Sequence, residues 1–369
     1  MSKPNPKNER IKRAYFQYLK EAQRYSDDTV DAVAKALNRF EVVSQFRDFA
    51  RFHREQAVAF KKRLAEQTNE RTGLRLSKAT LNSTLKILRS FFLWLAGQPG
   101  FKSRLHYSDA DYFNLSEKDV AVARAVRGSA FPALDQIHRV LAAMPSTTDV
   151  ERRNRALIAF CLLTGARADA LATVRLKHVD LDQGLLMNDA RDMRTKASKT
   201  FPTWFFPVDG EAREIVAEWI AHLRTSLNWT DADPLFPATK VAVGAVSRRF
   251  EAVGLTRDCW SNTTPIRQNF KAAFEKVGLP YFNPHSIRKT LGQLGEQLCR
   301  TPEEFKAWSQ NLGHSGVLVT LTSYGEVAQS RQSEIIRDLM RGETSADDMT
   351  AEDLIRELQK RIAKGKGRG

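Results

Sequence analysis

Asn283–Thr290 reads NPHSIRKT, which places a histidine and an arginine three positions apart next to a proline. Downstream, Leu312–Ser315 reads LGHS and Ser323–Gly325 reads SYG. Far upstream, Leu163–Arg167 reads LTGAR. Two arginines, two histidines and one tyrosine therefore stand beside turn-forming and helix-starting residues, which is a combination suited to binding an anion and moving protons.

These residue types match the chemistry of DNA strand cleavage by a tyrosine. Attack on a phosphodiester adds negative charge to the two non-bridging oxygens, and guanidinium forks bind paired oxygens without losing their proton, so Arg167 and Arg288 are the candidate phosphate ligands. A phenol with a pKa of about 10 needs nearby cations or a base before Tyr324 can attack, and the departing 5′ oxygen needs a proton. His285, His314 and a lysine are candidates for those roles. Because a phosphotyrosine conserves the bond energy, a second DNA end can displace it, and no metal or nucleotide cofactor is expected.

In this order, the motifs resemble those of the tyrosine recombinase (phage integrase) family, from about Phe131 to about Arg341. In that family the first arginine follows a Thr-Gly-x-Arg turn, a His-x-x-Arg pair comes after a long gap, and Leu-Gly-His precedes the nucleophilic tyrosine. The resemblance implies that Tyr324 forms a 3′-phosphotyrosine, with a spacing from His314 one residue longer than in many members. It also implies that His285 is a base or a phosphate hydrogen-bond donor and that His314 is a second donor.

The resemblance further implies a general-acid lysine in a β-hairpin between the first arginine and the His-x-x-Arg pair. The corresponding stretch, Asp192–Phe201, contains two lysines. Lys196 aligns best as the acid, and Lys199 is the alternative because it stands closer to the usual distance from Pro207. The sequence departs from the family pattern at Ala170, where members usually carry a carboxylate, so we expect support for Arg167 from elsewhere.

Each of these residues also has a plainer interpretation. A lone arginine or lysine is usually a solvated surface charge, a lone histidine is usually packed, and a tyrosine near a C-terminus usually packs as an amphipathic side chain. The joint order of the motifs favours catalysis over these explanations. Two other functions remain open: strand cutting and resealing of the type IB topoisomerase kind, and a DNA-binding regulator on a recombinase scaffold with no chemistry.

Composition points to a polyanionic partner. The 369 residues contain 58 Lys and Arg against 43 Asp and Glu, a net charge of +15, which predicts salt-sensitive binding to double-stranded DNA, although RNA or an anionic membrane surface would also suit it. No apolar run reaches the roughly 18 residues of a membrane span and no signal-peptide core is present, so we expect a cytoplasmic protein without a membrane partner. The three cysteines show no metal-ligand spacing, and Cys161, in an apolar run, is expected in the core.

The pattern along the chain predicts a mainly α fold with a small antiparallel sheet. Apolar residues recur at helical spacing from Asn8 to about Gly97, Ser77 is expected to cap a helix, and strands are expected only within 185–208. We expect a helical core-binding domain over 1–128 with a linker from about 102, and a catalytic domain over 129–344. The resemblance implies that these two domains form a C-shaped clamp around DNA.

Two basic stretches are candidate DNA contacts. In the first, Arg47, Arg51 and Arg54 interleave with aromatic residues, a pattern that also fits a buried aromatic face with solvated arginines. The second carries Arg248 and Arg249 in a region expected to be helical.

The C-terminal segment 345–369 is expected to form a short helix and a basic tail. Leu354, Ile355, Leu358 and Ile362 form one apolar stripe, which would suit packing on its own domain. The resemblance implies instead that this segment is exchanged between neighbouring subunits of a homotetramer on DNA.

Overall fold

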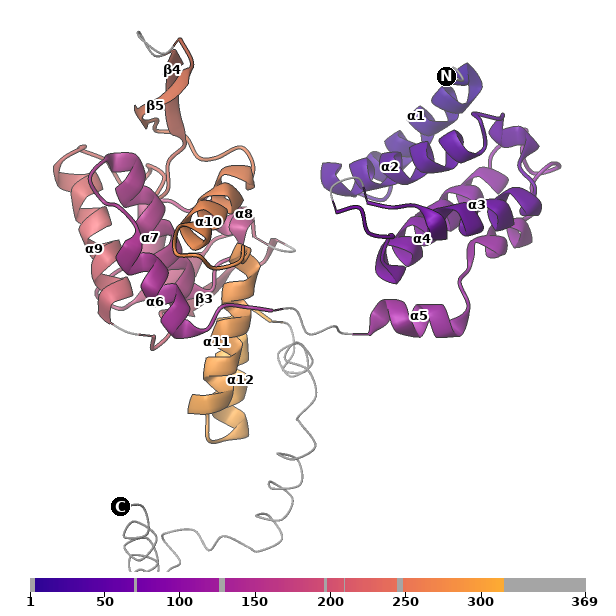
Figure 1. The fold of residues 1–369 in the computed structure, drawn as a ribbon. Coiled ribbons are helices and arrows are strands. Elements are labelled where there is room, and N and C mark those ends of the chain that lie inside the picture. Colours follow the sequence, from indigo (N-terminus) through magenta and orange to yellow (C-terminus); the bar gives the residue numbers. More distant parts are fainter. Residues whose placement is uncertain are drawn as a thin grey trace, which may run out of the picture. The chain divides into compact units, whose positions relative to one another are not determined.

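The structure, a computed structural model, describes residues 4–69, 72–125, 130–195, 198–208, 210–243 and 248–314. Helices dominate these residues, and the strands form two small antiparallel sheets, which confirms the predicted fold class. The chain divides into two compact units, one ending at Ala125 and the other beginning at Val126. We call them the N-terminal unit and the C-terminal unit and describe each by itself (Figure 1).

The N-terminal unit is helical. Its elements are α1 (Pro6–Glu21), α2 (Asp27–Val43), the 3-10 helix η1 (Phe49–Arg51), α3 (Arg54–Glu66), α4 (Lys78–Ala96), the 3-10 helix η2 (Tyr107–Phe113) and α5 (Glu117–Arg124). The predicted cap of α4 is confirmed, because the Ser77 hydroxyl accepts a hydrogen bond from the Thr80 backbone N–H.

Phenylalanine rings fill the core of this unit. Phe52 stacks on Phe92 with ring centroids 3.9 Å apart, and Phe40 meets Phe60 edge to face at 5.3 Å. Such offset and edge-to-face pairs add to the stabilisation from burial alone. Phe49 and Phe52, which alternate with arginines near residue 50, are therefore core residues.

The segment after about residue 102 was expected to be a linker, but its first part packs on the N-terminal unit. Leu105, Ala110 and Phe113 are each at most 3% exposed and belong to the same core as Phe92. Their isolated apolar side chains lie in an otherwise polar stretch, so the sequence gives no continuous amphipathic pattern. The assignment of the two units to the predicted domains stays a prediction.

The C-terminal unit combines helices with both sheets. Its helices are α6 (Leu134–Ala143), α7 (Asp149–Thr164), α8 (Ala168–Leu171), the 3-10 helix η3 (Leu176–His178), α9 (Gly210–Thr225), α10 (Thr264–Lys276), α11 (Pro284–Leu298) and α12 (Pro302–Asn311). Its strands are β1 (Val179–Asp180), β2 (Leu185–Asn188), β3 (Phe201–Trp204), β4 (Thr239–Val243) and β5 (Phe250–Leu255).

Helix α7 forms the centre of this unit. Residues 156–164 are all buried, so this helix contacts other elements on every side of its second half. Cys161 is fully buried, as predicted, and burial raises the pKa of its thiol to about 12. An apolar thiol of this kind is a packing residue.

The larger sheet has the order β1-β2-β3, with β3 at one edge. Strands β2 and β3 pair antiparallel with Leu186 opposite Thr203, and both lie within the predicted strand region. The segment between them, residues 189–200, contains both candidate general-acid lysines.

Helices do follow residue 208, beginning with α9, but a second pair of strands, β4 and β5, overturns the expectation that strands occur only within 185–208 and that Arg248 and Arg249 lie in a helical region. These strands form a hairpin that projects from the rest of the C-terminal unit (Figure 1). Val243 and Phe250 are 60% and 81% exposed, so the hairpin lacks the buried face that gives a strand its alternating sequence pattern.

Among the described residues, no helix is both long enough and apolar enough to cross a lipid bilayer.

Candidate active site

The turn after α7 positions Arg167. Gly165 ends α7 in the left-handed conformation, with φ of 58°, and a Cβ atom there would lie 3.0 Å from Leu312 Cδ2. The Thr164 hydroxyl donates to the Phe160 carbonyl at 2.7 Å and accepts from the Ala166 N–H. Arg167 then precedes α8, and its partial burial lowers the pKa of its guanidinium.

The opening of α11 positions His285 and Arg288. Asn283 caps the helix by accepting a hydrogen bond from the Ser286 N–H at 3.2 Å, and Pro284 occupies the first helical turn. The His285 side chain is exposed, whereas Arg288, one turn later, is only 4% exposed. The sequence Asn-Pro-His-x-x-Arg thus builds a capped helix start with one accessible imidazole and one buried guanidinium.

Arg288 connects three segments of the C-terminal unit. Its Nη1 donates to the Gly165 carbonyl at 2.6 Å, and its Nη2 donates to the Leu312 carbonyl and, at 2.9 Å, to His314 Nε2. These three acceptors are uncharged, so the bonds orient the guanidinium without cancelling its charge. Fixed cationic donors of this kind can stabilise charge that develops on a reacting phosphate.

The Leu312–His314 turn follows α12 directly. Gly313 has a φ of 66°, and a Cβ atom there would lie 2.5 Å from Phe201 Cζ, so any other residue would be strained and would displace the Phe201 ring. Leu312 is buried against the same core as α7. The turn therefore touches both Arg288 and the start of β3.

The lysine segment is anchored near both ends. On one side, Arg194 donates to the backbone carbonyls of Ser261 and Trp260 at 2.6 and 2.9 Å. On the other, the Thr200 hydroxyl accepts from the Ala190 N–H at 3.1 Å. Lys196 lies outside the described residues, and Lys199 is exposed.

Two expectations about this site have different outcomes. Tyr324 lies outside the described residues, so its role stays a prediction. Ala170 is buried in the hydrophobic core, which shows that this position gives Arg167 no charged support, while the neighbouring Asp169 side chain is exposed.

The basic residues predicted to bind DNA lie on both units. Arg47 and Arg51 are exposed and line a polar hollow together with Lys7 and His53. Arg54 is engaged locally, with Nε 3.3 Å from Glu55 Oε1 and the guanidinium 5.8 Å from the centre of the Tyr112 ring.

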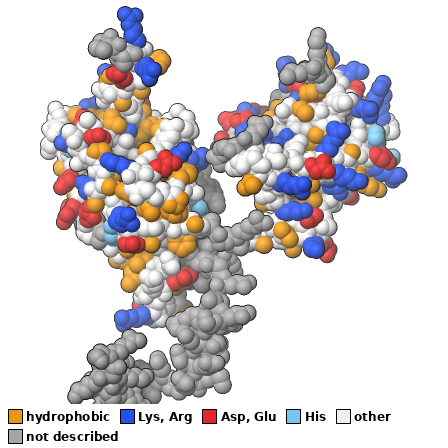
Figure 2. All heavy atoms as spheres, in the orientation of Figure 1, with side chains coloured by type: hydrophobic (Ala, Val, Ile, Leu, Met, Phe, Trp, Pro, Cys, Tyr) orange, Lys and Arg blue, Asp and Glu red, His pale blue; other side chains and the backbone are white. Residues whose placement is uncertain are grey.

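In the C-terminal unit, Arg248 and Arg249 directly precede β5. Both side chains are exposed beside Phe250, and basic and hydrophobic side chains are visible on this projecting hairpin (Figure 2).

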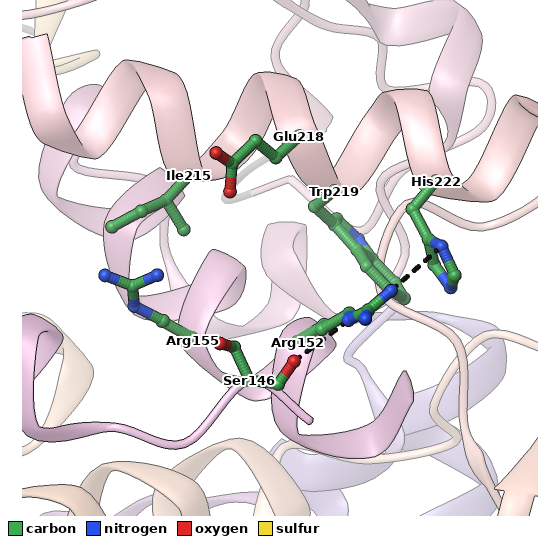
Figure 3. Close-up of a pocket in the computed structure, with 7 residues that line it drawn as sticks. All are labelled: Ser146, Arg152, Arg155, Ile215, Glu218, Trp219 and His222. Atoms are coloured by element: carbon green, nitrogen blue, oxygen red, sulfur yellow. Dashed lines mark hydrogen bonds between the residues drawn. The ribbon is translucent and has the colours of Figure 1, made fainter. Parts of the chain in front are cut away.

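A polar pocket between α7 and α9 is separate from the cluster of Arg288 and His314. Arg152 donates to the Ser146 carbonyl and to His222 Nδ1 (Figure 3). His222 Nε2 lies 2.8 Å from Asp149 Oδ1. These groups satisfy one another, so the pocket is explained by packing of the two helices. The described residues contain no cluster of three His, Cys, Asp or Glu side chains arranged to bind a metal.

The sequence analysis did not identify two polar residues beside the site, Asn311 and Thr203. Asn311, the last residue of α12, forms hydrogen bonds with the backbone of Trp204 in β3, and the Thr203 hydroxyl donates to the Asn311 carbonyl at 3.2 Å. The only sequence signal was the position of Asn311 directly before Leu312-Gly313-His314.

Comparisons with known proteins agree on one family. Residues 133–331, more than half of the chain, match the phage integrase family. Tyrosine recombinase XerC of Lactobacillus delbrueckii subsp. bulgaricus is 24% identical over 235 residues, which cover 60% of this chain and 70% of that protein.

Solved structures share the fold. The Tn1549 transposon integrase, in complex with transposon right end DNA, has a TM-score of 0.58 at 16% identity and covers 89% of this chain and 98% of its own. The XerH site-specific recombinase, in a post-cleavage complex with a palindromic difH substrate, also has a TM-score of 0.58, at 15% identity over 87% of this chain and 82% of its own.

Proposed function

This chain belongs to the phage integrase family of tyrosine recombinases, enzymes that cut and rejoin DNA, and we propose that it performs site-specific recombination through a 3′-phosphotyrosine intermediate at Tyr324. We propose further that the exchange integrates, excises or inverts a mobile element. The cleaved substrate is double-stranded DNA with specific recombination sites.

The environment of Arg288 carries this proposal. A buried guanidinium held by two backbone carbonyls and His314 is already oriented before DNA binds, so little reorganisation is needed when charge develops on the phosphate. Arg167 is assigned the second set of phosphate contacts, because the turn at Gly165 joins it to the same cluster. His314 is the additional hydrogen-bond donor to the phosphate.

The proposed cleavage step conserves the number of phosphoester bonds. The Tyr324 oxygen attacks phosphorus, the bond from phosphorus to the 5′ oxygen breaks, and the phenol proton passes to His285 or to water. Lys196, with Lys199 as the alternative, protonates the departing 5′ oxygen. Rejoining reverses these steps with a 5′ hydroxyl from a second DNA as the nucleophile.

Basic side chains on both units are assigned to the DNA backbone. The net charge of +15 favours a polyanion, and the exposed Arg47 and Arg51 of the N-terminal unit and Arg248 and Arg249 of the hairpin are the proposed contacts. Arg54 is assigned a weaker part, because Glu55 already pairs with it. In this proposal both units contact the duplex.

We predict that Arg248→Ala/Arg249→Ala weakens DNA binding and lowers the salt dependence. Each lost phosphate contact reduces the slope of log K against log salt by about 0.9, so the double variant should lose about 2. Fluorescence anisotropy across a salt series measures this slope. The matched control is Arg224→Ala/Lys271→Ala, which removes the same charge from residues paired with Asp231 and Glu275. An equal change in both variants would contradict the hairpin assignment.

Exchange between two DNA duplexes tests the proposed function and the role of the tail. We propose that a homotetramer on DNA swaps its C-terminal segments, as the family resemblance implies, so that the apolar stripe within residues 345–369 packs on a neighbouring subunit. Wild-type protein should join strands from two labelled duplexes carrying the site.

A protein ending at Thr344 should still cleave DNA, but its rate of strand exchange should be at least about tenfold lower than that of wild type. Relaxation of one supercoiled duplex without joining would favour a topoisomerase, and full exchange by the truncated protein would exclude the tail's role.

A further inference from the structure

Strand β3 is an edge strand, yet the backbone of its last residue is already hydrogen bonded. The Trp204 N–H donates to Asn311 Oδ1 at 2.7 Å, and Asn311 Nδ2 donates to the Trp204 carbonyl at 2.8 Å. One carboxamide thus pairs with both backbone groups, as a neighbouring strand would. This contact fixes the edge of the sheet to the end of α12.

A buried polar chain reinforces the same junction. Asn188 in β2 donates from Nδ2 to the Thr203 hydroxyl at 3.0 Å, and this hydroxyl donates to the Asn311 backbone carbonyl at 3.2 Å. Asn188 and Thr203 are 4% and 2% exposed. Because a buried polar group costs free energy when it loses its partner, these bonds hold β2, β3 and α12 in one register.

The junction lies between two parts of the proposed active site. On one side, β2 and β3 bound the segment 189–200, which contains the candidate acids Lys196 and Lys199. On the other side, Asn311 leads into the turn that supplies Arg288 with the Leu312 carbonyl and His314.

Gly313 gives an independent contact at the same place. The Phe201 ring of β3 lies directly against Gly313, so this ring would have to move before β3 and the Leu312–His314 turn could approach each other. Asn311 prevents the opposite movement, because its hydrogen bonds would break if β3 moved away. Together the two contacts oppose changes in the separation between β3 and the phosphate-binding cluster.

We propose that Asn311 is a positioning residue that holds the general-acid lysine in register with Arg288 and His314 through β3. This inference rests on the proposed function, since it assigns Asn311 to the proton transfer that accompanies strand cleavage. A general acid must lie within hydrogen-bond reach of the leaving oxygen, and a displacement of about 1 Å can cost about 100-fold in rate.

The test compares two leaving groups in the same nicked DNA substrate. One substrate has the natural 5′ oxygen at the cleaved bond, and the other has sulfur there. A thiol has a pKa of about 8.5, so the sulfur departs as a thiolate without a proton donor. A variant that has lost only the acid is therefore slow on oxygen and nearly normal on sulfur.

Asn311→Ala is expected to cleave the oxygen substrate about 10- to 100-fold more slowly than wild type and the sulfur substrate within about threefold of wild type. Asn311→Asp keeps the size but places an oxygen opposite the Trp204 carbonyl, so it should show the same selective loss. Lys196→Ala and Lys199→Ala provide the reference for loss of the acid. For each variant, the rates on the oxygen and sulfur substrates are measured with the same preparation. A smaller folded fraction lowers both rates equally and does not change their ratio.

Asn269→Ala is the matched control, because Asn269 also joins two elements through one side-chain amide, in this case α10 to α7, by donating to the Asn154 carbonyl at 2.9 Å. Its rate ratio should equal that of wild type. Equal slowing of Asn311→Ala on both substrates, or no slowing on either, would overturn the positioning role. If wild-type protein forms no adduct with either substrate, the proposed function itself fails, and this inference fails with it.

Discussion

Arg288→Ala is expected to lower the rate of covalent DNA cleavage by at least about 10³-fold, which is the scale found when a preorganised donor to a transition-state charge is removed. The guanidinium is 4% exposed and holds the Gly165 carbonyl, the Leu312 carbonyl and His314 together. Its removal would leave the phosphate without this charge and would release the Leu312–His314 turn. Single-turnover cleavage of a nicked DNA substrate measures the effect.

Arg288→Lys separates geometry from charge. A lysine keeps the positive charge but lacks the planar fork that reaches Gly165 and Leu312 together, so we expect a loss of at least about 100-fold. The control is Arg153→Lys, since Arg153 is also 4% exposed and donates to the Pro237 carbonyl and the Thr239 hydroxyl. If Arg153→Lys slowed cleavage as much, general destabilisation would explain both results and the assignment of Arg288 would fail.

Tyr324→Phe is expected to abolish the covalent protein–DNA adduct while DNA affinity changes by less than about twofold. The variant lacks only the phenolic oxygen, which the proposed reaction bonds to phosphorus, and loss of a nucleophile typically costs about 10⁴-fold or more. The assay uses DNA from sequence flanking the gene, nicked so that cleavage releases a short fragment, with a chelator present. Tyr281→Phe serves as the control, because Tyr281 is an exposed tyrosine of the same unit. Adduct formation by Tyr324→Phe would reject this nucleophile.

The fold class followed from sequence because its main signals are local. The apolar periodicity of the N-terminal region, the serine cap at residue 77 and the β-favouring residues at 203–206 each depend on neighbouring residues. The motif turns also follow local rules, since Gly165 and Gly313 adopt positive φ and Asn283 caps α11. The clustering of Arg288 with His314 could be anticipated only from the resemblance, because no local rule joins residues 26 positions apart.

The β4–β5 hairpin could not be predicted in the same way. Both Val243 and Phe250 are exposed, so burial imposes no alternation on the sequence of these strands. The basic residues Arg248 and Arg249 fit an exposed helix equally well. Only the antiparallel pairing of β4 with β5 distinguishes a hairpin from an exposed helix here.

Asn311 was hidden for a different reason. A single asparagine at the end of a helix is an ordinary residue in sequence, and its partners, Thr203 and Trp204, lie more than 100 positions away. Tertiary packing alone reveals that its carboxamide occupies the edge of a sheet. The interleaved arginines near residue 50 show the converse, because their neighbours Phe49 and Phe52 are core residues while the arginines themselves lie at the surface.

The most direct test of the central claim is peptide mapping of the trapped adduct. Wild-type protein is incubated in chelator with the nicked substrate, the complex is digested, and mass spectrometry identifies the residue that carries the nucleotide. Our account predicts a single modified peptide, with Tyr324 bonded to the 3′ phosphate of the cleaved strand and a free 5′ hydroxyl on the released fragment. Attachment to any other residue, a 5′-phosphate linkage, or cleavage without any protein-linked DNA would contradict it.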